Sequence, residues 1–135
     1  MTKILLVEDN ELNRDMLSRR LERRGFKIVL ACNGRDGILT ARSESPDLIL
    51  MDLSLPEIDG WQATRLLKSA PDTEDIPILV LTAHALISDR ERALRAGCDA
   101  FVCKPVDFDA LLNKINSLVN RKAGVYDDDC QTVNR

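Results

Sequence analysis

Polar residues that can handle a phosphate follow four of the five short apolar runs in this sequence. The four runs, each with the residues that follow it, are 3–7 (Glu8 and Asp9), 48–51 (Asp52), 78–81 (Thr82) and 100–103 (Lys104). In an open parallel α/β sheet, ligands bind just beyond the carboxyl ends of the strands. If the runs are strands of one sheet, three carboxylates, a hydroxyl and an ammonium meet in one crevice.

Three carboxylates in one crevice indicate a site for a divalent cation. Mg²⁺ prefers hard oxygen ligands and is usually held by one or two carboxylates together with phosphate oxygens and water. Carboxylates that lie close together resist ionising unless a cation lies among them, and Lys104 is expected to supply that charge when the metal is absent. Asp9 alone is also suited to cap a helix. That use does not account for Asp52 at the end of a different run.

Asp52 is the expected phosphoacceptor, because it ends the third and central strand and a carboxylate is a known nucleophile in phosphoryl transfer. Such transfer depends on positioning and charge neutralisation. A cation on one side and Lys104 on the other would divide that work, and the Thr82 hydroxyl would donate a hydrogen bond to a phosphoryl oxygen. Taken singly, Thr82 and Lys104 also suit an ordinary strand end and an ordinary surface lysine. Their joint placement favours the chemical role.

Helical segments separate the apolar runs. The first is indicated by Leu12, Met16, Leu17 and Leu21, which recur at near-helical spacing. Asp9 or Asn10 is able to cap its start, and Gly25 ends it. The expected helices span about residues 10–24 and 33–44, a segment opened by Asp59-Gly60, a short segment from Ser88 or Asp89 to Ala96, and 108–119.

Strand and helix alternate five times, which predicts an α/β fold with a doubly wound, five-stranded parallel sheet between two layers of helices. The continuous apolar runs are typical of strands buried on both faces. The flavodoxin-like strand order 2-1-3-4-5 is the expected one, with five helices. The domain is expected to cover residues 1–120, and the polar segment 121–135 is expected to be a disordered tail.

Composition excludes several classes of protein. The chain of 135 residues is 44% hydrophobic and 30% charged, close to soluble globular averages, and it has no apolar run near the roughly 18 residues of a membrane span. No secretory signal precedes the first strand, so a cytoplasmic location is expected. A net charge of −3 and the isolated basic run 19–24 argue against nucleic-acid binding.

The four cysteines and single histidine form no zinc or redox spacing, and Cys32, Cys98 and Cys103 are expected to be mostly buried.

The polar residues and their spacing resemble a bacterial response-regulator receiver domain of a two-component system. The resemblance covers about residues 2–120. It is carried by Glu8-Asp9-Asn10, Asp52, Pro56, Asp59-Gly60, Thr82-Ala83 and Lys104-Pro105.

The resemblance implies a role for each site residue. Asp52 would accept the phosphoryl group from a phosphohistidine on a sensor histidine kinase or a histidine phosphotransfer protein. Mg²⁺ would be bound by Asp9, Asp52 and the backbone carbonyl of Ser54, with Glu8 contributing through water. Thr82 and Lys104 would contact the phosphoryl group.

Further implied features concern control of the site. Phe101 matches the family's aromatic switch position, although plain core packing is an alternative use of a buried ring. Ser54 and His84 would lie at the rim of the site and tune the lifetime of the phosphoryl group; an exposed loop position is the alternative for His84. The Lys104-Pro105 bond would be cis, as is typical of the family.

Output is expected through a downstream protein target, because about fifteen residues after the last helix leave no room for another module. The expected protein is a stand-alone phosphoacceptor that assists only its own phosphorylation and dephosphorylation, and is a monomer or weak dimer.

One alternative is a receiver cut from a hybrid histidine kinase or a longer regulator. A remote alternative is an aspartyl-phosphate hydrolase of the haloacid-dehalogenase type, whose nucleophile lies on the first strand and not, like Asp52, on the third. A flavodoxin-type flavin carrier would lack carboxylates after the first strand.

Overall fold

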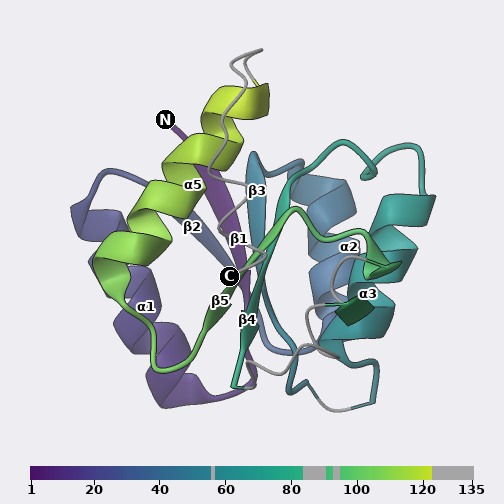
Figure 1. Ribbon diagram of the computed structural model, residues 1–135, viewed down its shortest axis with the longest axis horizontal. Coiled ribbons are helices and arrows are strands. Elements are labelled where there is room, and N and C mark those ends of the chain that lie inside the picture. The colour runs from purple at the N-terminus through teal and green to yellow at the C-terminus, as the bar shows by residue number, and fades with distance from the viewer. Residues whose placement is uncertain (56, 84–90, 93–94, 123–135) are drawn as a thin grey trace.

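The protein forms a five-stranded parallel sheet with helices on both faces (Figure 1). This computed structural model describes residues 1–55, 57–83, 91–92 and 95–122. The sheet order is β2-β1-β3-β4-β5, the flavodoxin-like order expected from the sequence. The strands are β1 (Lys3–Val7), β2 (Lys27–Ala31), β3 (Leu48–Asp52), β4 (Ile78–Thr82) and β5 (Ala100–Cys103).

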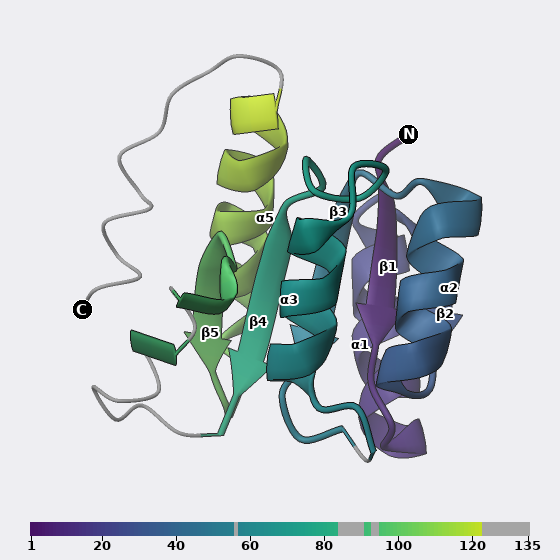
Figure 2. The same ribbon diagram turned by 90° about the vertical axis from the view of Figure 1, so that its right-hand side faces the viewer.

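Two layers of helices enclose the sheet. Figures 1 and 2 show α1 and α5 against one face and α2 and α3 against the other. The described helices are α1 (Glu11–Arg23), α2 (Gly34–Glu44), α3 (Gly60–Ser69) and α5 (Phe108–Lys122). A fifth helix was expected from Ser88 or Asp89 to Ala96. Residues 84–90 and 93–94 lie outside the described residues, and the described pairs 91–92 and 95–96 are helical.

Local capping chemistry sets where the helices begin. The side chains of Asn10, Asn33 and Asp59 accept hydrogen bonds from the backbone N–H three residues on, at 3.0, 2.8 and 2.9 Å. Gly25, with φ +92°, ends α1, and the N–H of Phe26 returns to the carbonyl of Leu21. The helix starts were therefore predictable from sequence alone.

The core confirms the expected burial of the central strands and corrects it for the edge. Every residue of β3 and β4 is buried, as two-sided cover by helices requires. In β2, Lys27 and Leu30 are exposed and Ile28 and Val29 half-buried, because β2 lies at the edge of the sheet. Among the cysteines, Cys98 is buried as expected, whereas Cys103 is half-buried and Cys32 is exposed, which corrects the prediction for these two.

The apolar stripe expected on α1 packs only in part. Leu17 and Leu21 are buried, whereas Leu12 and Met16 are 80% and 55% exposed. Leu12 and Met16 each lie about 140° around the helix from the residue five positions on, Leu17 and Leu21, so one face of α1 cannot bury all four. An apolar rim therefore faces outward beside the crevice.

The last helix runs slightly further than expected. It continues through Lys122, two residues past the expected domain end at Asn120, a difference within the usual uncertainty of helix ends. Residues 123–135 lie outside the described residues, so a disordered tail stays a prediction.

Candidate functional site

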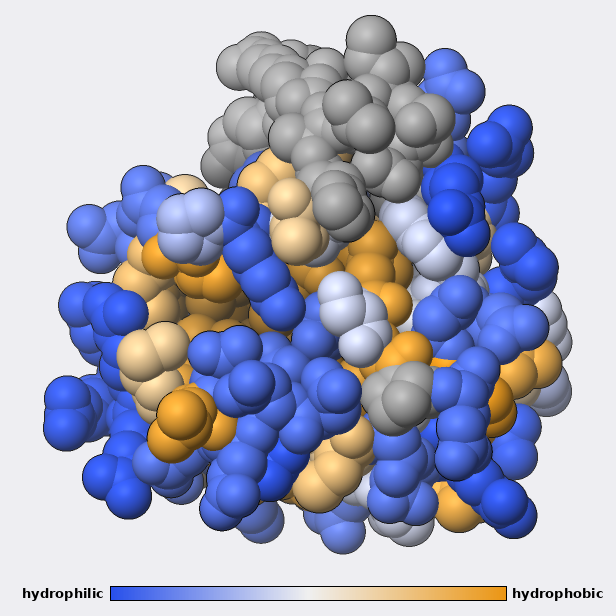
Figure 3. Space-filling model, turned by 90° about the horizontal axis from the view of Figure 1, so that it is seen from below, coloured by the Kyte–Doolittle hydropathy of each residue, from blue (hydrophilic) through white to orange (hydrophobic). Residues whose placement is uncertain are grey.

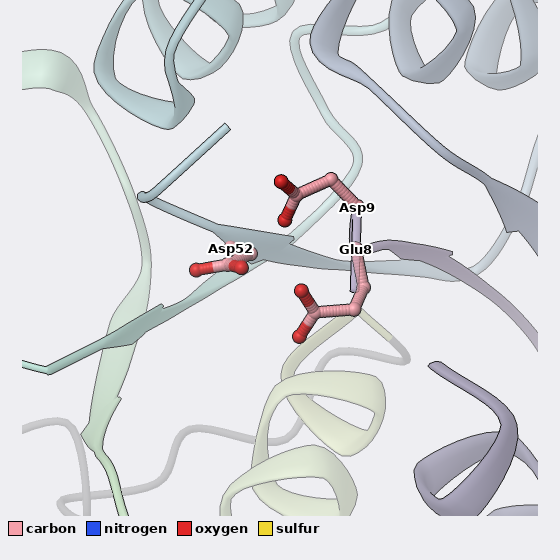
Figure 4. Close-up of side chains that lie close together, drawn as sticks. All are labelled: Glu8, Asp9 and Asp52. Atoms are coloured by element: carbon pink, nitrogen blue, oxygen red, sulfur yellow. The ribbon is translucent and has the colours of Figure 1, made fainter. Parts of the chain in front are cut away.

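Two neighbouring strands bring the three carboxylates together. β1 pairs with β3 in parallel, with Val7 opposite Met51, so the residues that follow them lie side by side. Glu8 and Asp9 follow β1, and Asp52 ends β3. One carboxylate oxygen from each of the three lies within 4.8 Å of the others. Figure 4 shows the three side chains pointing toward one another.

The cluster is buried at its base and open at its mouth. Glu8 is 2% exposed and Asp52 1% exposed, whereas Asp9 is exposed. The N–H of Asn10 donates to Glu8 Oε2 at 3.2 Å, which directs the Glu8 carboxyl inward. A ligand entering from solvent therefore meets Asp9 first.

This environment makes the Glu8 carboxyl a weaker acid than usual. Burial is the main cause that raises its pKa from 4.5 to about 7, and a hydrogen bond with Asp52 and the negative charge of Asp52 raise it further. The Asn10 N–H and the Lys104 ammonium act in the opposite direction. In the metal-free protein, Glu8 therefore keeps its proton at mildly acidic pH.

Lys104 supplies the positive charge of the site. Its Nζ lies 3.2 Å from Asp52 Oδ1 and 3.8 Å from Glu8 Oε1. The Lys104 N–H donates to the Thr82 carbonyl at 2.7 Å, which extends the β4–β5 pairing by one residue, and the bond to Pro105 is cis, as the resemblance implied. The lysine thus reaches the carboxylates from two strands away in the sheet.

The other expected residues lie around this centre. Ser54 is exposed, and its N–H donates to Asp52 Oδ1 at 3.1 Å. Thr82, 4% exposed, ends β4 next to β3, and Phe101, 6% exposed, lies opposite Val80 in the sheet. His84 lies outside the described residues.

Close packing at Gly60 supports the phosphoacceptor strand. A Cβ at Gly60 would lie 2.5 Å from the Asp52 carbonyl oxygen and 2.7 Å from Leu53 Cα. Real Cβ atoms do not approach backbone this closely, so α3 can begin here only with glycine. The sequence pattern marked Gly60 as a helix start but not as a contact with Asp52.

Sequence reasoning missed the contact of Arg14 with the site. Its Nη1 donates to the Glu8 carbonyl at 2.9 Å and to the Asp9 carbonyl at 3.4 Å. An arginine one helical turn past a capping asparagine is the only sequence signal for this contact, and it is weak.

A groove of about 260 Å³ opens beside the carboxylates. Figure 3 views the molecule from the carboxyl ends of the strands and shows an apolar hollow on the α1 side. The groove is lined by Glu8, Asn13, Met16, Leu17, Arg20, Leu81, Lys104, Pro105 and Val106. It joins exposed apolar surface of α1 to the chemical centre.

The donor set fits Mg²⁺. All the atoms that the three carboxylates offer are hard oxygens, they lie within reach of a single ion, and the repulsion among them is relieved by a cation. A binding site with an exposed Asp9 also leaves room for water and phosphate oxygens.

The chain belongs to the family of response regulator receiver domains, whose model matches residues 4–116. This family of two-component signalling domains is the one that the sequence resembled. The fold agrees with it, but a flavodoxin-type flavin carrier would share this strand order. The family match and the carboxylates that follow β1 favour the receiver over the hydrolase and the flavin carrier. No helix among the described residues is long and apolar enough to cross a membrane.

Individual relatives agree with this assignment. The chain is 37% identical over 118 residues to the polar-differentiation response regulator DivK of Brucella ovis, which covers 87% of this chain and 96% of the relative. The receiver domain of a signal transduction histidine kinase from Syntrophus aciditrophicus is 33% identical, with a TM-score of 0.84, over 90% of this chain and 92% of that one. The receiver domain of a sensor histidine kinase from Pseudomonas aeruginosa is described with a magnesium ion in its active site cleft. It is 36% identical, with a TM-score of 0.78, over 92% of this chain and 98% of that one.

Proposed function

We propose that this receiver domain accepts a phosphoryl group on Asp52 from a phosphohistidine of a sensor histidine kinase or a histidine phosphotransfer protein. The observation that carries the proposal is the convergence on Asp52 Oδ1 of the Lys104 ammonium at 3.2 Å and the Ser54 N–H at 3.1 Å, beside two further carboxylates. These two partners hold the buried Asp52 carboxylate in one orientation.

In the proposed step, an Asp52 carboxylate oxygen attacks the phosphorus atom. A P–O bond forms, the P–N bond to the donor imidazole breaks, and the nitrogen keeps the electron pair. Glu8, Asp9, Asp52 and the Ser54 carbonyl are the proposed ligands of Mg²⁺, Glu8 through water. When bound, the ion supplies positive charge that neutralises the transferred phosphoryl oxygens.

The remaining contacts to the phosphoryl group are proposed to come from side chains and backbone of this chain. Lys104 lies near Asp52 and is the proposed partner of a phosphoryl oxygen, which means that it exchanges a carboxylate contact for a phosphate contact. The Thr82 hydroxyl is the proposed second donor. The Lys104 ammonium and the Ser54 N–H already lie beside Asp52, so their part in the reaction needs little reorganisation. The protein acts as a phosphoacceptor and not as an enzyme with a separate substrate.

Output is proposed to pass through Thr82 and Phe101. Phosphorylation would draw the Thr82 hydroxyl toward Asp52 and shift an existing equilibrium of the surface formed by residues 84–104. Phe101 is already buried without a phosphoryl group. A phenylalanine ring has no hydroxyl to bond outside, so its inward position is proposed to be populated in both states. Ser54 and His84 are the proposed residues that tune phosphoryl lifetime.

The partners of this surface are proposed to be proteins. The groove beside α1 suits a helix of the phosphodonor, because it exposes apolar Met16 next to Lys104 and leads to Asp52. A downstream protein would read the residues 84–104. Both a stand-alone regulator and a receiver from a hybrid histidine kinase remain compatible with the relatives, which include both kinds. A cytoplasmic monomer or weak dimer without nucleic-acid binding is the proposed form.

The assignment of Asp52 is tested by labelling with acetyl phosphate. Intact-mass measurement in the presence of Mg²⁺ should show one added phosphate on the wild type and none on Asp52→Asn. Asp72→Asn, a change of the same kind at an exposed surface position, is the control and should label normally. Labelling of Asp52→Asn at the wild-type level would refute the assignment.

A further inference from the structure

Arg14 makes an unusual contact for a residue on a half-exposed helix face. Its guanidinium Nη1 turns back from α1 to the carbonyl oxygens of Glu8 at 2.9 Å and Asp9 at 3.4 Å. These carbonyls belong to the turn that joins β1 to α1 and that presents both acidic side chains. Among the residues that the structure describes, Arg14 forms no ion pair.

The other bonds of this turn hold different parts of it. The Glu8 N–H donates to the Ala31 carbonyl at 3.1 Å, and the Asn10 N–H holds the Glu8 carboxylate at 3.2 Å. Both of these bonds fix Glu8. Asp9 is exposed, and neither bond reaches the peptide between Glu8 and Asp9, whose carbonyl accepts from Arg14 at 2.9 Å. Arg14 therefore ties the Asp9 backbone to the helix, and the direction of the Asp9 carboxylate depends on that backbone.

The choice of a carbonyl partner has a chemical consequence. A cation that paired with the Asp9 carboxylate would compete with a metal ion for the same oxygens. Arg14 instead bonds to backbone oxygens, so the carboxylate stays open, and its positive charge still lies beside the acidic cluster. Lys104 behaves differently, because it contacts carboxylate oxygens of Asp52 and Glu8 directly.

We propose that Arg14 is a positioning residue for the divalent-cation site, which holds Asp9 in its binding orientation through the carbonyls of Glu8 and Asp9. The proposal deepens the proposed function and rests on it for the identity of the ion, Mg²⁺. Groups that orient metal ligands typically change metal affinity by about tenfold or more when they are removed.

Arg19 on the same helix provides a matched control. Its Nε pairs with Asp15 Oδ1 at 3.0 Å on the exposed surface, and both side chains are more than half exposed. Arg14→Gln and Arg19→Gln remove the same charge from the same helix. Only the first removes the bonds to the acidic turn. Arg14→Lys keeps the charge but replaces the planar guanidinium with a compact ammonium on a flexible stem, which does not fix a donor where Nη1 lies.

The test is a calorimetric titration of each metal-free variant with Mg²⁺, with no phosphodonor present. Arg14→Gln is expected to raise the dissociation constant about tenfold over the wild type, Arg14→Lys to raise it by less, and Arg19→Gln to leave it near the wild-type value. The rate of labelling by acetyl phosphate should fall for Arg14→Gln at limiting Mg²⁺ and recover at saturating Mg²⁺. That pattern separates metal binding from transfer.

Equal Mg²⁺ affinities of Arg14→Gln and Arg19→Gln would overturn the proposal, as would a wild type that binds no Mg²⁺. If Arg14→Gln fails to fold by circular dichroism, Arg14→Lys decides, because an affinity equal to wild type in that folded variant shows that the paired geometry is not needed. If Mg²⁺ affinity separates the two arginines while the wild type takes no phosphate, the positioning role stands and the phosphoacceptor role falls.

Discussion

Lys104 and Asp52 are 52 residues apart in the sequence and meet at 3.2 Å, between Nζ and Oδ1. The same ammonium lies 3.8 Å from Glu8 Oε1, and its side chain is 27% exposed against 2–3% for the two carboxylates. One half-exposed lysine is therefore the ion-pair partner of two buried acidic side chains in the metal-free protein. In the presence of a phosphoryl group, the same donor is available to a phosphate oxygen.

Replacing Lys104 with Met should slow labelling of Asp52 by acetyl phosphate about a hundredfold, because a donor aimed at the transferred oxygens is removed. Mg²⁺ should bind as well as in the wild type or better, since the ammonium no longer neutralises the carboxylates. Mass spectrometry over time measures the rate. Lys27→Met on the exposed edge strand is the control, and a Lys104→Met rate equal to that of the control would contradict the role.

Glu8 makes the stability of the metal-free protein depend on pH. Its pKa is about 7 in the folded protein against 4.5 ordinarily, so the folded state holds the proton more tightly. Between these values the free energy of unfolding should fall as pH rises, because the unfolded chain ionises Glu8 first. Glu8→Gln lacks this dependence. Urea unfolding in chelator at about pH 5 and pH 7.5 should show a larger loss in the wild type, and parallel pH profiles would refute this explanation.

A substitution at Met16 tests docking of the phosphodonor without changing the residues of the phosphorylation site. A charge at this exposed apolar position, in Met16→Glu, should reduce transfer from a cognate phosphohistidine protein about tenfold and leave acetyl phosphate labelling unchanged. Leu66→Glu is the control, because Leu66 is 50% exposed, close to the 55% of Met16, but lies on α3 across the sheet. Arg14 is unsuitable for this test, since it contacts the acidic turn. Equal loss in both variants would point away from the α1 groove.

Thr82 tests the coupling of the site to the surface. Thr82→Ala should still accept phosphate on Asp52 but should weaken the response of residues 84–104 to beryllofluoride, because the hydroxyl that moves toward the phosphoryl group is gone. Chemical shifts in NMR spectra with and without beryllofluoride measure the response. Thr40→Ala on α2 is the control. Wild-type shifts in Thr82→Ala would show that the signal takes another route.

Thr64 offers a stability test away from the site. Its hydroxyl is fully buried in α3 and, among the described residues, has no hydrogen-bond partner. Thr64→Val has nearly the same shape and removes that unpaired group, so it should raise the free energy of unfolding by about 1 kcal/mol. Urea denaturation measures it, with Thr40→Val on α2 for comparison. A loss of stability would reveal a partner for the hydroxyl, such as buried water.

The amino-acid sequence by itself determined the order of elements, the strand order and the family. Capping residues such as Asn33 and Asp59 act within one helical turn, and apolar runs reflect burial in a parallel sheet, so both are local signals. Polar residues at strand ends predicted the site for the same reason. The carboxyl ends of parallel strands share one edge, whatever the details of packing.

Only the tertiary structure decided how those residues meet and which apolar residues are covered. The pKa of Glu8 depends on its burial against Asp52, and the carbonyl bonds of Arg14 depend on the path of one turn. Periodicity marked Leu12 as inward and the apolar run 28–31 marked Leu30 as buried, but Leu12 lies on the side of α1 opposite Leu21 and Leu30 lies on an edge strand. Such outcomes follow from distances between elements remote in sequence, and residue spacing along the chain carries no record of them.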